Sequence, residues 1–268
     1  MIYVNVSKQT NEIKSIVESI MEITKDIFVA GGALTSIFTK QPINDLDFYF
    51  KNKQTLEDTL QHLTDDNWFL SFASKKALTL VKGEEIVQLI YYKYFNSIQD
   101  IFKEFDFSVN MCAFDGDSKS IIMHEDFLPS LANREILFNQ NTPYPIISLY
   151  RTKKYLERGY IIPTQTTLKI GMAISNLNIT SWEGLEDQLG GVYGELNLTG
   201  KHKDIPFNMN YAIDNFSTLF VIKTETPNLN AKKLFEISGL VNDSLPGNHG
   251  FLNFNNTPKT PSKKLFTL

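Results

Sequence analysis

The stretch that decides the fold is IFVAGGALTSIFTKQPINDLDFYF, which runs from Ile27 to Phe50. Its apolar opening, Ile27–Ala30, is typical of a buried strand. Gly31 and Gly32 follow, and Ala33–Thr39 then has the composition of one or two helical turns. The proline that comes next ends that helix, because proline lacks the amide hydrogen that a helix needs. The stretch therefore predicts a strand, a glycine turn and a short helix.

The end of this stretch, Asn44–Phe50, alternates polar and apolar residues. In a strand this period places Asp45 and Asp47 on one face, roughly 7 Å apart along the chain. Hard oxygen ligands suit Mg²⁺, which proteins usually hold with one or two carboxylates plus substrate phosphates. We therefore predict that Asp45 and Asp47 are catalytic residues that bind Mg²⁺ or Mn²⁺. The alternative is a pair of solvated acids on an edge strand.

The glycine pair predicts a phosphate-binding turn. Without side chains, Gly31 and Gly32 allow backbone amides at a helix start to approach a phosphate closely. Thr35 and Ser36, in the first turns of the predicted helix, would hold the same phosphates. A phosphate turn followed by paired acids is the layout that phosphoryl or nucleotidyl transfer requires.

The order of strand, Gly-Gly turn, helix and Asp-x-Asp strand resembles the DNA polymerase β-like nucleotidyltransferase superfamily. It is most similar to the head domain of CCA-adding enzymes and bacterial poly(A) polymerases, especially phage-encoded relatives. The resemblance implies an α/β (α+β) fold, with a small mixed sheet flanked by helices. It implies a head domain over residues 1–130, a smaller and mostly helical part over 131–246, and a polar tail over 247–268.

A second motif follows the first at a plausible distance. The segment FDFSVNMCAFD, Phe105–Asp115, resembles a family segment that lines the nucleotide site near the sugar. The resemblance assigns that role to Asp106 and Asn110. Asp106 is also a candidate for a third metal-binding carboxylate. The alternative is a core strand in which Asp106 caps a turn.

Three departures from the family pattern bear on catalysis. Gln88 stands where many relatives carry an acid, and an amide is a weak neutral ligand that cannot act as a base. Glu104 and Phe105 replace a pair of arginines, so Lys93 or Lys103 would have to supply the positive charge. The base-reading Glu-Asp-x-x-Arg motif is also missing, and its positions hold other residues: Tyr144, Pro145 and Ser148. We therefore predict no selection between C and A.

The predicted helix that begins near residue 146 carries a basic face. Arg151, Lys154 and Arg158 lie at i, i+3 and i+7, which places them on one side of a helix. Such a face binds phosphate or a nucleic-acid backbone, which makes Arg151 and Lys154 candidate ligand-binding residues. A solvated helix face is the favoured interpretation of the same pattern.

Composition is that of a globular protein without a global nucleic-acid signature. The 268 residues carry a net charge of −4 and a pI of about 5.6. The single cysteine, Cys112, rules out an internal disulfide and fits a reducing compartment. There is no signal-peptide pattern and no apolar run of membrane-spanning length. We expect a cytoplasmic protein, in the host cytoplasm if phage-encoded, with no membrane partner.

The sequence supports three hypotheses. The first is a metal-dependent nucleotidyltransferase that moves an NMP from an NTP to a hydroxyl acceptor, with an RNA or tRNA 3′ end favoured. The second is a catalytically degenerate protein on the same fold that binds nucleotide, RNA or a protein partner. The third is a phage component that uses the head as a scaffold and the tail, 247–268, as a protein-binding segment.

Overall fold

A mixed seven-stranded sheet forms the centre of the molecule. The computed structural model describes residues 6–22, 24–73, 76–189, 195–196, 198, 202 and 204–221. The sheet order is β3-β4-β5-β2-β1-β6-β7, in which β2 and β5 are parallel and the other pairs are antiparallel. The strands are β1 (Ile27–Ala30), β2 (Leu46–Phe50), β3 (Phe69–Ala73), β4 (Ala77–Lys82), β5 (Glu85–Ile90), β6 (Cys112–Asp115) and β7 (Ser120–Met123). This confirms the predicted fold class.

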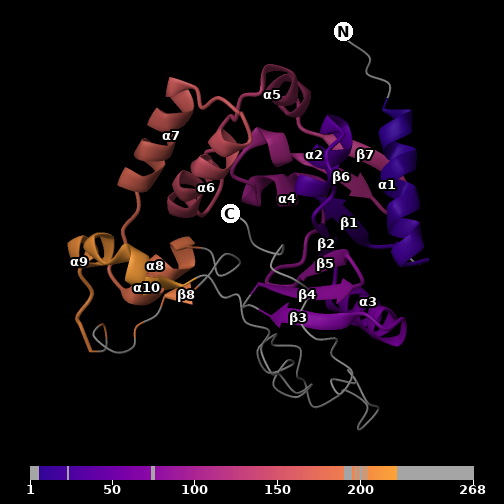
Figure 1. Ribbon diagram of the computed structural model, residues 1–268, viewed down its shortest axis with the longest axis horizontal. Coiled ribbons are helices and arrows are strands. Elements are labelled where there is room, and N and C mark those ends of the chain that lie inside the picture. Colours follow the sequence, from indigo (N-terminus) through magenta and orange to yellow (C-terminus); the bar gives the residue numbers. More distant parts are fainter. Residues whose placement is uncertain are drawn as a thin grey trace.

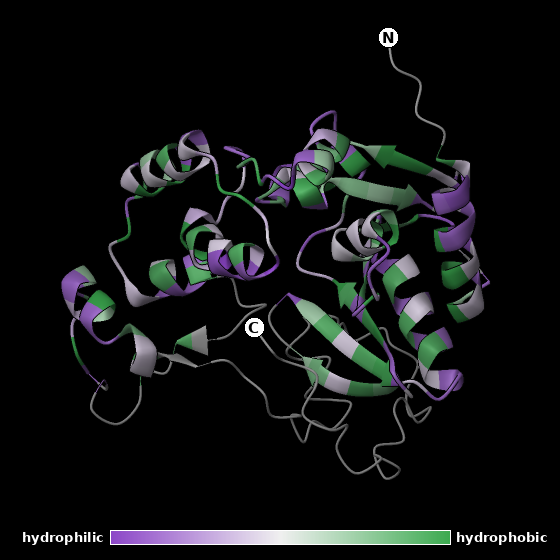
Figure 2. Ribbon diagram, turned by 45° about the horizontal axis from the view of Figure 1, so that its top comes forward, coloured by the Kyte–Doolittle hydropathy of each residue, from purple (hydrophilic) through white to green (hydrophobic). Residues whose placement is uncertain are grey.

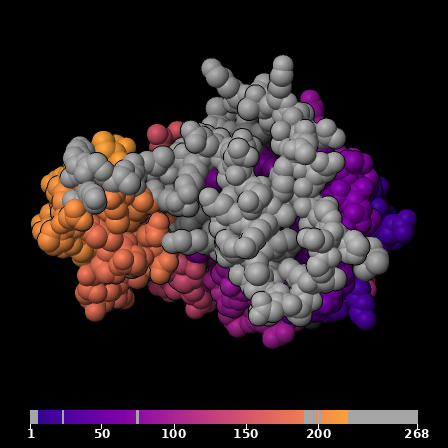
Figure 3. Space-filling view, turned by 90° about the horizontal axis from the view of Figure 1, so that it is seen from below, coloured from indigo at the N-terminus to yellow at the C-terminus, as the bar shows by residue number. Residues whose placement is uncertain are grey.

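Helices flank the sheet and then continue beyond it. Those within the sheet region are α1 (Ser7–Ile20), α2 (Gly32–Thr39), α3 (Lys53–Asp65), α4 (Ile98–Glu104), the 3₁₀ turn η1 (Ser108–Asn110) and α5 (Phe127–Asn133). The rest are α6 (Pro145–Glu157), α7 (Thr164–Ser175), α8 (Trp182–Leu189), α9 (Met209–Asp214) and α10 (Phe216–Leu219), with short strands β8 (Glu195–Leu196) and β9 (Phe220–Val221). Figure 1 shows α6 to α10 gathered at one side of the sheet, and Figure 3 shows the indigo N-terminal part and the orange part of the chain at opposite sides. No helix in the described part of the chain has the length and apolarity needed to cross a membrane.

Alternation along the central strands divides the core into two layers. Leu46, Phe48 and Phe50 of β2 pack into a large cluster with α1 and α3. Tyr49 faces the other side, with Phe28 and the inner residues of α4. Figure 2 shows the strands predominantly green, whereas the surrounding helices carry both colours. Asp45 and Asp47 therefore share the face that carries Tyr49, as the period-2 pattern predicts.

A third apolar cluster joins the sheet region to α6 and α7. Phe107 and Val109 pack there against Ile136, Tyr155 of α6 and Ile170 of α7. The rings of Phe107 and Tyr155 meet edge to face with centroids 5.2 Å apart. This cluster fixes α6 against the segment that carries Asp106. The predicted boundaries at 130 and 246 remain predictions, and the tail at 247–268 lies outside the described residues.

Candidate functional site

The paired carboxylates lie at the start of β2, in the middle of the sheet. Asp47 is on the strand, between Ala30 of β1 and Gln88 of β5, and Asp45 directly precedes the strand. The Gln88 Nε2 donates a 2.8 Å hydrogen bond to Asp45 Oδ2. The amide that replaces the family's acid thus orients one of the two carboxylates.

Burial raises the pKa of both acids. Burial raises the pKa of Asp47 well above its usual range, and the neighbouring Asp45 charge raises it further. Burial likewise raises the pKa of Asp45, although Lys154 and Arg158 oppose the shift. Two carboxylates held together in this way need a compensating positive charge. Their oxygen donors fit a divalent cation such as Mg²⁺.

Gly31 adjoins the carboxylates in a backbone conformation that favours glycine. Its φ is +91°, and a Cβ there would stand 3.4 Å from Asp47 Oδ2 and 3.7 Å from the Phe105 ring. The Gly31 amide donates to the Cys112 carbonyl oxygen at 3.1 Å, so this N–H is already hydrogen-bonded to the first residue of β6. Gly32 opens α2, and a Cβ on it would meet nothing within 4 Å. Only the first glycine of the pair is therefore constrained by the fold.

The hydroxyls predicted to hold phosphate differ in their surroundings. Thr35 Oγ1 donates a 2.5 Å hydrogen bond to the Val109 carbonyl oxygen, which ties α2 to η1. A phosphate contact from Thr35 would have to replace that bond. Ser36 is the next residue of α2 and is half-buried.

The second motif meets α6 through two buried contacts. Arg151 Nη1 donates to Asp106 Oδ2 at 2.7 Å, and Asp106 is only 3% exposed. Four positions along α6, the Tyr155 hydroxyl accepts a 2.6 Å hydrogen bond from Asn110 Nδ2. Sequence analysis did not find Tyr155, because an aromatic residue on the inner face of a helix predicts packing rather than a polar contact.

The basic face of α6 points toward the acids. Arg151 has a side chain that is 19% exposed, and its charge acts on both Asp47 and Asp106. Lys154 is half-buried, and burial lowers its pKa, with Arg151 and Arg158 lowering it further. The solvated face favoured from sequence therefore holds only for Arg158, which is exposed. The reason is tertiary: the third apolar cluster turns this side of α6 inward.

Two other predicted site residues, Lys93 and Asp106, are paired with other side chains. Lys93 Nζ forms a 2.5 Å ion pair with Glu104 Oε1 and lies over the Phe95 ring. Asp106 is held by Arg151. Within the described ranges, no group of three or more His, Cys, Asp or Glu side chains is arranged to hold a metal. The pair of Asp45 and Asp47 thus stands without the third carboxylate considered for Asp106.

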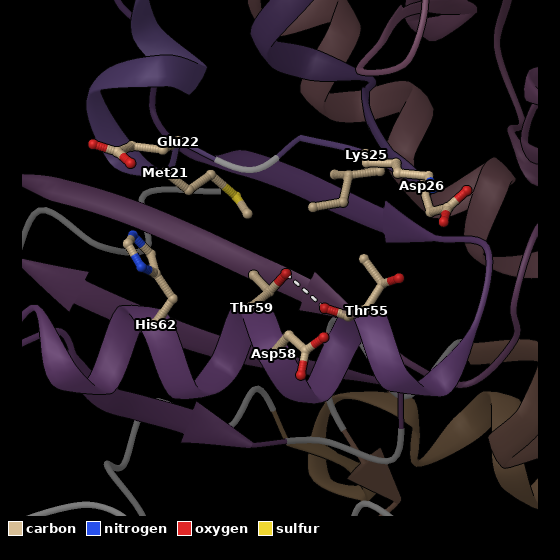
Figure 4. A pocket seen from close by; sticks show the side chains of 9 residues that line it. Met21, Glu22, Lys25, Asp26, Thr55, Asp58, Thr59 and His62 are labelled. Carbon is tan, nitrogen blue, oxygen red and sulfur yellow. Dashed lines mark hydrogen bonds between the residues drawn. The ribbon is translucent and has the colours of Figure 1, made fainter.

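A separate pocket of about 310 Å³ lies at the opposite end of β1. Ile27 begins β1 there, whereas Ala30 ends the strand beside Asp47. Figure 4 shows side chains of α3 below the pocket, among them Thr59, whose hydroxyl donates to the Thr55 carbonyl at 2.7 Å. The remaining lining side chains are mixed in charge: Met21, Glu22, Lys25, Asp26, Asp58 and His62. The pocket does not include the carboxylate pair.

The raised pKa of Asp47 predicts a pH effect on stability. Between the ordinary value of 3.8 and the higher folded-state pKa, the folded chain binds a proton that the unfolded chain does not. The free energy of unfolding therefore gains a contribution as pH falls through that window. We expect Asp47→Asn to remove the contribution and to be more stable than the wild type at neutral pH. Urea unfolding of both proteins across this pH range measures the difference, and parallel profiles would contradict the prediction.

Solved structures with a similar fold are CCA-adding enzymes. The complex of a CCA-adding enzyme with ATP matches with a TM-score of 0.51 at 17% identity, over 74% of this chain and 52% of that chain. The complex with CTP gives a TM-score of 0.50 at 16% identity, over 74% and 51%. The chain has the nucleotidyltransferase head fold. At this level of identity the nucleotidyltransferase likeness establishes the fold alone.

Sequence comparison points to a different biological setting for this nucleotidyltransferase fold. Residues 3–134 match the model of the Gabija anti-defense 2 family. The chain is also 35% identical over 207 residues to Gabija anti-defense 2 of Bacillus phage SPbetaL7, over 75% of this chain and 52% of that protein. The chain therefore spans about half the length of this relative.

These matches correct the main functional prediction. The sequence motifs predicted a transferase that adds nucleotides to an acceptor hydroxyl, with RNA or tRNA 3′ ends favoured. That prediction is wrong, since the matched family and the phage relative are anti-defense proteins. The error arose because the motifs record a fold that different functions share. The alternative hypothesis, a phage protein that uses the same fold for binding, agrees better with the matches.

Proposed function

We propose that this chain is a phage anti-defense protein that counteracts the Gabija defence. The family match over residues 3–134 and the phage relative support the proposal. Its partner would be a component of that defence, which it would engage in the host cytoplasm. In this proposal the nucleotidyltransferase-like head supplies a ligand site, and the bound ligand controls or completes binding to that defence component.

The ligand we propose is a nucleoside triphosphate together with a divalent cation. One observation carries this proposal: two acids, Asp45 and Asp47, lie within electrostatic range of the cations of α6. Gly31 adjoins these acids. Asp45 and Asp47 would hold the metal, with Gln88 orienting Asp45. The bound metal would neutralise charge on phosphate oxygens. The similar CCA-adding enzyme structures are complexes with ATP and CTP, which agrees with a nucleotide ligand.

Two contacts favour binding over nucleotidyl transfer. Gln88 occupies the place of an acid and cannot accept the proton of an attacking hydroxyl. Asp106 is engaged by Arg151 at 2.7 Å, and that pairing favours a structural role for its carboxylate. A site with metal-binding acids but without a base retains ligand affinity and lacks the proton acceptor that transfer requires.

An infection assay tests the proposal. Bacteria that carry the Gabija defence would express the wild-type chain, the Asp45→Asn/Asp47→Asn double variant or the exposed control Asp65→Asn, and would then be challenged with a phage that Gabija restricts. We expect the wild type and the control to restore plaque formation at least about tenfold more than the double variant. The amide replacements keep the side-chain shapes and remove the repulsion, so loss of folding is not expected.

Each outcome bears on one part of the proposal. Failure of the wild type to restore plaques would overturn the anti-defense role. Equal restoration by the double variant would overturn the role of the carboxylates. A thermal-shift titration of the purified proteins with Mg²⁺ and each of the four NTPs tests ligand binding directly. If the wild type released pyrophosphate and the double variant did not, the site would catalyse turnover, and the proposal of binding alone would be overturned.

A further inference from the structure

Lys154 is held in an unusual place for a lysine. It lies on the same face of α6 as Arg151, one turn further along the helix. The 2.7 Å contact between Arg151 and Asp106 and the packing of Tyr155 fix which side of α6 faces the sheet. Lys154 therefore points toward the carboxylates, and its charge acts on Asp45, Asp47 and Asp106.

The lysine nevertheless stops short of those carboxylates. Its neighbours on α6 are paired: Arg151 with Asp106 at 2.7 Å and Lys153 with Glu157 at 3.9 Å. Lys154 forms no ion pair within 4.0 Å and no hydrogen bond from its ammonium group with any residue that the structure describes. A half-buried ammonium group without a partner is costly, since burial removes its hydration. Among the described residues, the Lys154 ammonium group therefore keeps its hydrogen-bonding capacity for a ligand.

We propose that Lys154 is a switchable counter-ion of this site. Without ligand it partly balances the charges of Asp45 and Asp47, and it thereby competes with a divalent cation. With a metal and a polyphosphate present, its ammonium group binds the phosphate oxygens instead. The inference rests on the proposed function and specifies it: recognition is of the polyphosphate, through α6, rather than of a base.

The switch predicts two effects of opposite sign in one variant. Removing the charge with Lys154→Met keeps most of the apolar stem and takes away the competing cation. We expect Mn²⁺ alone to bind this variant roughly three- to tenfold more tightly, because the positive charge that repels the cation in a partly buried site has been removed. We expect tripolyphosphate, added with saturating Mn²⁺, to bind about tenfold more weakly, because a phosphate ligand has been lost.

Mn²⁺ titration followed by electron paramagnetic resonance, and calorimetric titration of tripolyphosphate, measure both effects on the full chain. Lys153→Met is the matched control on the same helix and should change neither affinity. Lys154→Arg keeps the charge and should keep both affinities within about threefold of the wild type. Melting curves of all variants establish that they are folded.

Two failures are distinguishable. If the wild type binds Mn²⁺ and nucleotide while Lys154→Met shifts both affinities in the same direction, or neither, the counter-ion inference is overturned and the proposed function stands. If the wild type binds no nucleotide with Mn²⁺, the proposed ligand site is overturned and the inference fails with it.

Discussion

Replacing Arg151 with alanine is expected to lower the free energy of unfolding by about 3–5 kcal/mol, as breaking a buried ion pair does. Asp106 is 3% exposed and receives the 2.7 Å hydrogen bond from Arg151 Nη1. Its other oxygen, Oδ1, is buried and has no hydrogen-bond partner among the described residues. Removing the guanidinium would therefore leave a buried carboxylate whose main compensating charge is gone. Urea unfolding at neutral pH measures the loss.

The control for this prediction lies on the same helix. Arg158→Ala removes an equal charge from an exposed position, and we expect it to change stability by less than about 0.5 kcal/mol. Adding Asp106→Asn to the Arg151→Ala variant removes the uncompensated charge and should restore part of the stability. If Arg151→Ala unfolds like Arg158→Ala, the buried ion pair is not a principal attachment of α6.

Replacing Gly116 with alanine is expected to destabilise the fold by about 3 kcal/mol or more, the upper range for overpacking. A Cβ at Gly116 would stand 2.0 Å from the Thr24 carbonyl oxygen and 2.8 Å from that of Ile27. Both neighbours are backbone atoms, so neither can rotate away. The Gly116 amide also donates to Ile27 at 3.0 Å, and its carbonyl accepts from Thr24 Oγ1 at 3.1 Å. The loop before β1 would have to separate from the end of β6.

Gly171 provides the opposite control. It is an exposed residue within α7, and a Cβ there would meet nothing within 4 Å. Gly171→Ala should stabilise the protein by about 0.5–1 kcal/mol, because alanine loses less backbone freedom than glycine in a helix. Thermal unfolding of the two variants should therefore move in opposite directions. A Gly116→Ala protein as stable as the wild type would contradict the packing described here.

The local sequence pattern was sufficient to predict β1, α2 and β2, the elements around Asp45 and Asp47. The apolar run Ile27–Ala30, the glycine turn and the alternation around Asp47 each depend on residues within a few positions of one another. Strand period and glycine geometry act at that range, so β1, α2, β2 and the shared face of Asp45 and Asp47 follow from sequence. The resemblance to the nucleotidyltransferase head rests on the same short segments, which is why it predicted the fold and misassigned the function.

The partners of the charged groups were decided at long range. Gln88 reaches Asp45 across 43 positions, and Arg151 reaches Asp106 across 45. Neither pairing has a periodic signal, because it depends on which strands are neighbours and on how the third apolar cluster orients α6. From sequence, the α6 cations were assigned a solvated face and Asp106 was a candidate metal ligand.

The sequence by itself therefore determined the mixed α/β fold, the position of the carboxylate pair and the glycine that adjoins it, since local sterics and side-chain alternation specify them. Only the tertiary structure decided which charges meet. Burying Tyr155 with Phe107 turns the basic side of α6 toward the acids, and that burial sets the balance of charge at the site. Electrostatic interactions depend on distance and burial in three dimensions, which sequence spacing does not encode.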